Sequence, residues 1–425
     1  MSQMNDFPFI PYLQKSQASY ICTDIEILDF TKVFKGNLII YTPQGNFSIP
    51  LDEIRNLPTI FHILVDNVFC YLTIGWNLKA LFSYFKFHYR HKQNLENLRI
   101  FDLKLAEQFT GNNTAKPDSF SEAIDRLKIA LSDEKTKKIA KQIHKPLLTS
   151  TLPEIETRRL LYKSQNKIFP FYHIEGQVNG RLSSSKVGKM FFCPHTLSQE
   201  ERKSIGLPDV GQKFLSLDFA HMEVSMLAYL SKDPLLVEIN NQEKDLYQVV
   251  YKEIFEEECN TNEQRNLIKK VFLPIMYGEQ TATLASNLGY SSSDAANIIK
   301  IIRIKFSTAY DWLKEKQEQL NKNDTQIDFL GRRRKFSERP WSVRNFHIQS
   351  PAALVCLEKL IELNRKLPVI LHIHDEYILM LGSRESFNTA KASLLSDSNL
   401  CPGLKLHIKA KFGENLAEMK KLPLT

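Results

Sequence analysis

Cysteine is scarce and dispersed in this sequence of 425 residues. None of the six cysteines forms a C-x-x-C pair, and none lies in a cluster with histidine. This spacing argues against a structural zinc site and against a disulfide framework. We therefore expect reduced thiols in a cytosol-like compartment. The six are Cys22, Cys70, Cys193, Cys259, Cys356 and Cys401.

Long hydrophobic runs and a targeting segment are also missing. The first residues, MSQMNDFPFIPYLQKS, do not combine a basic segment with an apolar run, so we expect no secretion signal. The most apolar early stretch, TIFHILVDNVFCYLTIGW, is interrupted by Asp66 and Asn67 and is too broken to span a bilayer. We expect a soluble protein without membrane contact, cytoplasmic in a bacterial, phage or plasmid context or nucleoid-associated, with an organelle as the alternative.

What the sequence does have is length and a moderate positive charge. A chain of 425 residues with 43% hydrophobic content can fill two or three cores. Its net charge of +8 suits a polyanionic partner, although composition alone is weak evidence for nucleic acid.

One acidic residue stands where a strand pattern changes into a helix pattern. Phe214–Ser231 begins as the apolar strand FLSLDF and continues with helical spacing of apolar residues, which places Asp218 at the strand end. A lone acid at such a position is more often a solvated carboxylate than a functional one.

A second acidic site in the chain favours a functional role for Asp218. In Leu367–Leu381, two strand-like runs flank His374, Asp375 and Glu376, so these residues are predicted at the turn of a β-hairpin. Adjacent acids in an apolar hairpin are costly unless they are paired or bind a cation. Brought together on one sheet, Asp218 and Asp375 would hold a pair of divalent metal ions, which can activate a hydroxyl and stabilise a leaving phosphate oxygen.

Between the two acids lies a helical pattern with cations on one face. Arg265, Lys269, Leu273 and Tyr277 follow at intervals of four residues. A solvated basic end on a core helix is the ordinary interpretation of such a pattern. The order of guanidinium, ammonium and ring also suits a triphosphate followed by a base.

These stretches together resemble the family A DNA polymerases, the DNA polymerase I family, from about Leu160 to the end of the chain. The resemblance depends on several motifs in one order. They are GRLSSS at Gly180–Ser185, LDFAHMEVSMLAYLSKD at Leu217–Asp233, R-x3-K-x7-YG at Arg265–Gly278, GRRR at Gly331–Arg334, RNFHIQSPAA at Arg344–Ala353 and HDE at His374–Glu376.

The resemblance implies an α/β (α+β) fold, a right-hand polymerase with palm and fingers in residues 161–425 and a linker with a reduced thumb in 112–160. It implies template-directed addition of dNTPs to a primer 3′ end, with two Mg²⁺ ions, or Mn²⁺ in their place. Primer–template DNA and dNTPs are the expected partners. The short thumb suggests reliance on a processivity or replisome partner.

Site roles follow from the resemblance residue by residue. Asp218, Asp375, Glu376 and Lys269 are expected in catalysis, and Asp218, Asp375 and the Phe219 backbone carbonyl are expected to bind metal. Residues expected to bind the nucleotide are Arg265, Lys269, Leu273, Tyr277, Glu223 and Tyr247; those expected to bind DNA are Arg181, Asn345, Gln349, His374, Arg332 and Arg333.

Several positions depart from the family pattern. Tyr247 stands where relatives have a phosphate-contacting histidine, Leu273 replaces an aromatic residue and Pro274 replaces a glycine, so a bend is expected in that helix. Glu223 matches the residue that favours deoxyribonucleotides. Lys409 and Lys411 near the C-terminus are interpreted as solubilising.

Residues 1–111 are similar, more weakly, to an RNase H-like 3′→5′ exonuclease domain. That domain holds metal with an Asp-x-Glu and with an Asp after an NLK segment, but here Leu81 occupies the latter position. Asp24 and Glu26 fit the Asp-x-Glu in one alignment, whereas another alignment places Tyr41–Pro43 there. We therefore expect a degenerate domain and an enzyme without proofreading.

Two other functions remain open on sequence grounds. A related single-subunit RNA polymerase is disfavoured by Glu223 and by GRLSSS. A non-catalytic factor that binds primer–template is disfavoured because Asp218, Asp375, Arg265 and Lys269 are all present. A role in replication and a role in gap-filling repair are both compatible with the sequence.

Overall fold

The protein is described from a computed structural model that divides into two compact units. Unit 1 comprises Met1–Leu217, Leu357–Ser393 and Ala410–Thr425, and unit 2 comprises Asp218–Cys356 and Leu394–Lys409. The structure describes residues 18–23, 26–29, 33–35, 37–42, 45–50, 72–79, 81–82, 98–112, 115–163, 166–174, 177, 179–186, 191–209, 211–242, 245–320, 324–337 and 340–424.

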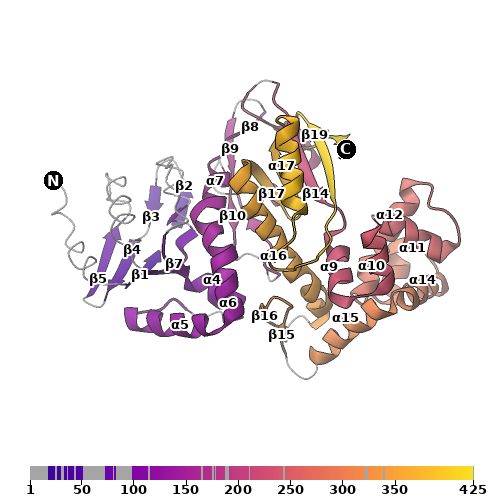
Figure 1. The fold of residues 1–425 in the computed structure, drawn as a ribbon, viewed down its shortest axis with the longest axis horizontal. Helices are drawn as coiled ribbons and strands as arrows, with labels where there is room; N and C mark the ends of the chain where they lie inside the picture. The colour runs from indigo at the N-terminus through magenta and orange to yellow at the C-terminus, as the bar shows by residue number, and fades with distance from the viewer. Residues whose placement is uncertain are drawn as a thin grey trace. The chain divides into compact units, whose positions relative to one another are not determined.

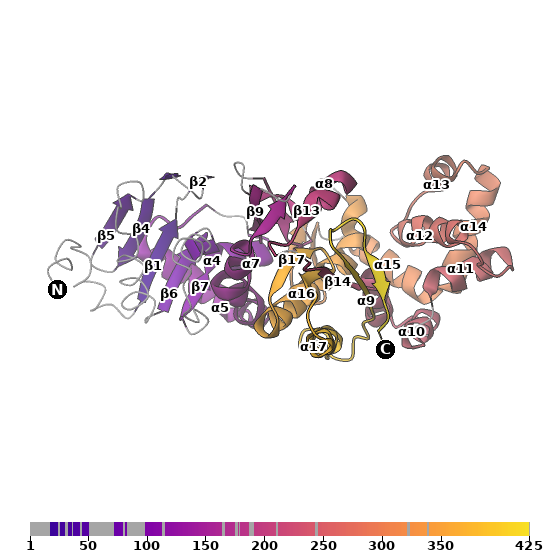
Figure 2. The ribbon, with the colours of Figure 1, turned by 90° about the horizontal axis from the view of Figure 1, so that it is seen from above.

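Unit 1 begins with a mixed five-stranded sheet of order β5-β4-β1-β6-β7. The central strand β1 pairs antiparallel with β4 and parallel with β6, and β7 is parallel to β6. Figure 2 shows these strands side by side. The strands are β1 (Ala18–Thr23), β4 (Asn37–Thr42), β5 (Gly45–Pro50), β6 (Leu72–Trp76) and β7 (Ile100–Asp102); β2 (Glu26–Asp29) and β3 (Val33–Lys35) form a separate ribbon.

Helices cover this sheet and continue toward residue 156. Ala123 and Leu127 pack against Tyr20 and Ile74 of the strands in one buried cluster. The helix α4 begins at Leu103, directly after β7 ends at Asp102. The elements are α4 (Leu103–Phe109), α5 (Phe120–Ser132), α6 (Glu134–Ile139), the π-helical turns η4 (Ala140–His144) and η5 (Leu147–Thr151), and α7 (Leu152–Glu156).

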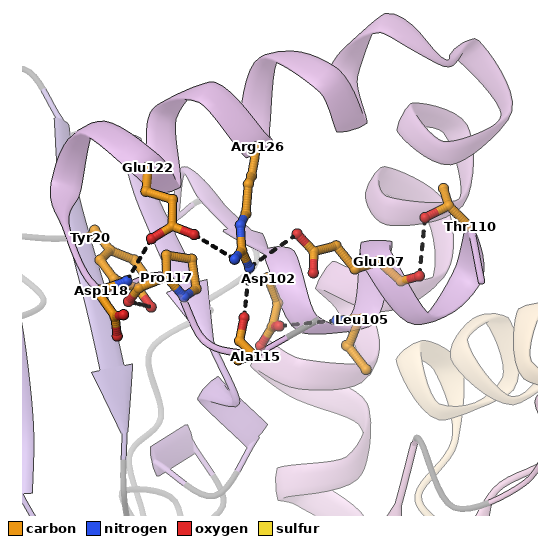
Figure 3. Close-up of polar contacts among 10 residues, drawn as sticks. All are labelled: Tyr20, Asp102, Leu105, Glu107, Thr110, Ala115, Pro117, Asp118, Glu122 and Arg126. Atoms are coloured by element: carbon orange, nitrogen blue, oxygen red, sulfur yellow. Dashed lines mark hydrogen bonds and ion pairs between the residues drawn. The ribbon is translucent and has the colours of Figure 1, made fainter. Parts of the chain in front are cut away.

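The described part of the predicted linker at 111–119 is docked onto this domain (Figure 3). Arg126 donates to the carbonyl of Ala115 at 2.7 Å and pairs with Glu122 at 2.5 Å. Tyr20 donates to the carbonyl of Pro117 at 3.2 Å. The linker is therefore held by side chains of both β1 and α5.

The two-stranded ribbon β10-β11 and most of two larger sheets also lie in unit 1. A four-stranded sheet has the order β12-β9-β8-β13, and a five-stranded sheet has the order β17-β18-β14-β19-β20. Leu160 and Ile168 of the first share a buried cluster with Phe214 and Leu371 of the second. The hairpin predicted at Leu367–Leu381 is confirmed as β17 and β18, which pair antiparallel.

The elements of this region are as follows. The strands are β8 (Leu160–Tyr162), β9 (Asn166–Pro170), β10 (Tyr172–His173), β11 (Ser183–Ser184), β12 (Phe191–Phe192), β13 (Ile205–Gly206), β14 (Phe214–Phe219), β17 (Val369–Ile373), β18 (Glu376–Met380), β19 (Ile408–Gly413) and β20 (Lys420–Leu422). The helices are the 3-10 turn η6 (Pro194–Thr196), α8 (Gln199–Ser204) and α17 (Arg384–Leu395); α16 (Val343–Lys366) begins in unit 2 and ends in unit 1.

Unit 2 is mainly helical. The predicted passage from strand to helix is confirmed, because β14 ends at Phe219 and α9 begins at Met222. Helices α11, α12 and α14 gather in one group in both views (Figures 1 and 2). The elements are α9 (Met222–Ser231), α10 (Pro234–Asn241), α11 (Leu246–Phe255), α12 (Asn262–Met276), α13 (Thr281–Leu288), α14 (Ser292–Lys305), α15 (Ser307–Leu320), β15 (Thr325–Ile327), β16 (Arg333–Lys335) and the 3-10 turn η7 (Pro340–Ser342).

Buried polar groups position the helices of unit 2. Asp233 is 1% exposed; its carboxylate caps α10 at Leu236 and accepts a second hydrogen bond from Ala309 of α15, each at 3.1 Å. Thr261 and Gln264 form a capping box that begins α12.

Among the described residues, no helix is long and apolar enough to cross a membrane.

Candidate active site

Asp218 lies at the second-to-last position of β14 and is partly exposed. The following side chain, Phe219, is 2% exposed and is therefore held in the core. His221 has a φ of 60° and precedes α9, which turns the chain sharply away from the strand. This geometry leaves the Asp218 carboxylate at the end of a rigid strand.

In unit 1, the HDE motif forms the tight turn between β17 and β18. His374 has a φ of 60°, and Glu376 is the first residue of β18. Ser216 of β14 donates a short hydrogen bond to Glu376. Glu376 thus makes a contact within the sheet, and its part in catalysis stays a prediction.

Histidine rings surround this turn, and sequence reasoning missed one of them. His195 lies 4.7 Å from His374 between ring centroids, and its Nδ1 contacts the Ser184 hydroxyl of the GRLSSS motif at 2.6 Å. Burial, with the charge of His374, lowers the pKa of His195 to about 4. A neutral His195 therefore links the GRLSSS segment to the HDE turn.

Arg181 is positioned by its own turn. The Asn179 side chain accepts a hydrogen bond from the Arg181 backbone N–H at 3.2 Å. Asn179 thus orders the backbone that carries the arginine.

Three residues predicted for separate roles come together in unit 2. The Glu223 carboxylate accepts hydrogen bonds from the Tyr277 hydroxyl at 2.6 Å and from the Gln349 amide at 2.9 Å. The three side chains come from α9, from the end of α12 and from α16. This cluster fixes the position of the Tyr277 ring relative to Glu223.

A buried arginine supports the end of α12. Arg344 is 8% exposed and contacts the Met276 carbonyl at 3.4 Å. Gly278 has a φ of +99°, and a Cβ built there would lie 3.4 Å from the Arg344 guanidinium. Glycine is required at this position by its backbone conformation. Arg344 was not among the residues expected from the sequence to have a role.

The cationic face of α12 is present, with acidic and aromatic partners. The Nε atom of Arg265 pairs with Asp245 at 2.7 Å, and the guanidinium lies 5.0 Å from the centre of the Tyr247 ring. Burial raises the pKa of Asp245, but Arg265 more than offsets this and holds it below its usual value. Lys269, one turn further on, is exposed.

Tyr247 lies in the interior beneath Arg265. Its ring is 5% exposed, and the His221 ring meets it edge-on at 4.7 Å. Burial raises the pKa of Tyr247 to about 12, so the phenol is neutral at physiological pH. In this position Tyr247 supports the Arg265 guanidinium, and its contact with the nucleotide phosphates stays a prediction.

The cations of the GRRRK segment differ in their exposure to solvent. Arg332 is 6% exposed, and burial lowers its pKa to about 10 although the nearby Asp328 raises it. Arg333 and Lys335 are exposed on β16. A DNA contact is therefore more compatible with Arg333 than with Arg332 in this conformation.

The remaining predicted residues lie in the expected elements. Leu273 and Pro274 occupy the last turn of α12, and the bend expected from Pro274 stays a prediction. Asn345 lies in α16, one turn before Gln349.

Asp218 belongs to unit 2 and Asp375 to unit 1, so their shared metal site also stays a prediction. In the described ranges, no group of three His, Cys, Asp or Glu side chains is arranged to hold a metal.

A family model decides the relationship of this chain to known proteins. The model for DNA polymerase family A matches residues 86–418. The chain belongs to DNA polymerase family A. The resemblance seen in its motifs is thereby confirmed.

Individual family A relatives are distant. DNA polymerase I of Synechocystis sp. is 25% identical over 158 residues, which cover 37% of this chain and 16% of the relative. DNA polymerase theta of Drosophila melanogaster is 26% identical over 247 residues, which cover 50% of this chain and 12% of the relative. The chain thus spans only a small part of the length of these relatives.

A solved structure shares the fold over nearly the whole chain. The POL domain of Pol1 from M. smegmatis, in complex with a DNA primer-template and dNTP, has a TM-score of 0.75 at 14% identity. The match covers 96% of this chain and 97% of that chain. The expected polymerase fold, with mixed helix and sheet, is therefore confirmed; the exonuclease-like nature of the N-terminal region stays a prediction.

Proposed function

We propose that this family A member is a template-directed DNA polymerase that adds dNTPs to a primer 3′ end. The observation that carries the proposal is the arrangement along α12. Arg265 and Lys269 provide positive charge on one face, and the helix ends at Tyr277, which is bonded to Glu223. A triphosphate and a base would meet these groups in that order.

The oxygen donors of the motifs fit divalent magnesium. Asp218 offers a carboxylate, and Phe219 offers a backbone carbonyl held in place by its buried side chain. Asp375 would provide the second carboxylate. When bound, two Mg²⁺ ions, or Mn²⁺ in their place, would activate the primer hydroxyl and neutralise charge on the leaving phosphate.

The protein side chains would bind and orient the substrates. Arg265, held by Asp245 and Tyr247, would bind the phosphates with its remaining N–H groups, and Lys269 would donate a proton to the departing pyrophosphate. In unit 1, Arg181 and His374 would contact the primer terminus. Asn345, Gln349 and Arg333 of unit 2 would contact the duplex or template.

Glu223 would select against ribonucleotides, and its hydrogen bonds make this testable. Replacement of Glu223 by alanine is expected to reduce the preference for dNTP over NTP by about a hundredfold, because the wall beneath the sugar is removed. Comparison of kcat/KM for matched dNTP and NTP substrates measures the change.

Tyr277→Phe is the matched control for that variant. It removes the 2.6 Å hydrogen bond to Glu223 and keeps the ring. We expect it to change the preference by less than about tenfold, the size of one hydrogen bond. If Glu223→Ala keeps the wild-type preference, Glu223 does not select the sugar. Preferential NTP use by the wild type would instead favour an RNA polymerase.

We further propose that the N-terminal domain is a degenerate nuclease with a structural role. Leu81, at the position of a family metal ligand, is fully buried. The Asp102 carboxylate accepts hydrogen bonds from the backbone of Leu78 at 2.9 Å and of Leu105 at 3.3 Å. Asp102 thereby fastens the NLK segment to α4. The side chains of Asp24 and Glu26 lie outside the described residues.

Nuclease activity provides the test. The wild-type protein with Mg²⁺ is expected to leave a single-stranded 3′ end intact, because at least one metal ligand is absent. Asp24→Ala is expected to behave identically on an end-labelled oligonucleotide. Degradation by the wild type that Asp24→Ala abolishes would overturn the assignment.

The short helical region 112–160 supports a second proposal, that extension over long templates needs a processivity partner.

A further inference from the structure

Lys409, which lies outside every motif assigned above, is placed beside the motif that carries Asp218. It is the second residue of β19, which neighbours β14 in the sheet. The Ala220 N–H donates to the His407 carbonyl at 2.7 Å. This bond joins the chain just after Asp218 to the chain just before Lys409.

The segment before Lys409 is held by α9 and α10. Asn240 of α10 donates to the Lys405 carbonyl at 3.1 Å, and His407 contacts the Asn240 carbonyl at 2.8 Å. Ser225 of α9 in turn donates to the Asn240 side chain at 2.9 Å. The backbone that presents Lys409 is therefore anchored, and the lysine cannot be regarded as part of a loose tail.

Charges from three elements face Lys409. Lys409 reaches solvent, but partial burial lowers its pKa, as do the charges of Arg265 and Lys269, whereas Asp245 and Asp218 raise it. His221 lies in the same field: burial, then Lys409, lowers its pKa to about 4, so it adds no charge at neutral pH.

The sum of these charges favours an anion. The field contains three positive charges, from Lys409, Arg265 and Lys269, and two negative charges, from Asp218 and Asp245. Of these, Asp245 is already paired with Arg265. Two exposed lysines from separate elements thus share a field with excess positive charge. Such a field attracts a ligand with several negative charges close together.

We propose that Lys409 is a phosphate-binding residue of the nucleotide site and supplies a third cation to the triphosphate. This inference rests on the proposed function for the location of the site. A lysine ammonium suits the task because it is a compact charge with three rotatable donors. On this proposal Lys409 has a role beyond the solubilising one interpreted from the sequence.

The first test uses inorganic tripolyphosphate and the full-length protein without DNA or divalent metal. Isothermal titration is expected to give a Kd about tenfold weaker for Lys409→Met, the effect of one charge-assisted contact. Lys411→Met is the matched control, because Lys411 is an exposed lysine two residues along the same strand, opposite Lys421 of β20. It is expected to bind as the wild type does.

The second test measures dNTP binding to the protein on a dideoxy-terminated primer–template, which cannot react. Lys409→Met is expected to weaken dNTP binding by about tenfold and to leave primer–template binding unchanged. Equal melting temperatures of the three proteins exclude a folding defect.

The outcomes separate the two proposals. If Lys409→Met binds tripolyphosphate and dNTP as Lys411→Met does, the role of Lys409 is refuted and the polymerase assignment stands. If Lys409→Met weakens only the binding of primer–template, the phosphate-binding role of Lys409 is also refuted, since Lys409 would then contact the DNA backbone. A wild type that binds tripolyphosphate through Lys409 but extends no primer would refute the polymerase assignment alone.

Discussion

Replacement of Asp218 by alanine is expected to slow primer extension by about a thousandfold or more. Loss of a metal-binding carboxylate removes several kcal/mol of transition-state stabilisation, and about 4 kcal/mol corresponds to three orders of magnitude in rate. Single-turnover extension of a labelled primer at saturating dNTP measures the loss. Fluorescence anisotropy of primer–template should show that binding is retained, because affinity comes mainly from phosphate contacts.

Asp375→Ala provides a parallel test of the shared metal site. If both acids serve the same ions, each single variant should lose nearly as much activity as the double variant, since groups that act as a unit are not additive. Asp311→Asn, an exposed acid of α15, is the control and should extend primers normally. Near-wild-type extension by Asp218→Ala would show that Asp218 takes no part in the reaction.

Replacement of Glu156 by alanine is expected to destabilise unit 1 by about 3–5 kcal/mol, the cost of leaving a buried charge without its partner. Lys79 and Glu156 pair at 2.6 Å with side-chain exposures of 12% and 3%. Glu156 also accepts the Tyr172 N–H at 2.7 Å, and the Lys79 ammonium lies 3.8 Å from the centre of the Phe171 ring. The pair thus connects the NLK segment with the strands that follow α7.

A double variant separates the charge effect from packing. Lys79→Met with Glu156→Leu removes both charges and should recover much of the lost stability. Chemical denaturation gives the change in unfolding free energy. Hydrogen exchange should show reduced protection of the backbone amides around residues 78–82 and 160–174. If Glu156→Ala lowers the unfolding free energy by less than about 1 kcal/mol, the Lys79–Glu156 pair contributes no more to stability than a surface ion pair.

The elements that carry Asp218 and Asp375 could be predicted because their signals are local. The strand FLSLDF and the helix after it have different hydrophobic periods, and the runs around His374–Glu376 are apolar on both sides of a polar turn. The spacing of Arg265, Lys269 and Tyr277 likewise predicts one helix. In each case the residues involved are neighbours in the chain.

The partners of those residues could not be predicted in the same way. Lys79 and Glu156 are 77 residues apart, and Glu223 and Gln349 are 126 apart. The pattern GRRR likewise does not show that Arg332 turns inward and Arg333 outward. The position of the Tyr247 ring under the Arg265 guanidinium was likewise not predictable from spacing.

The sequence by itself determined the family, the order of the motifs and the secondary structure that carries them, because these depend on residue type and short-range spacing. Only the tertiary structure decided which side chains share an electrostatic field. Lys409 and Arg265 are 144 positions apart, and Coulomb interaction depends on distance in space. The assignment of Lys409 to the phosphates therefore arises from the folding of the chain.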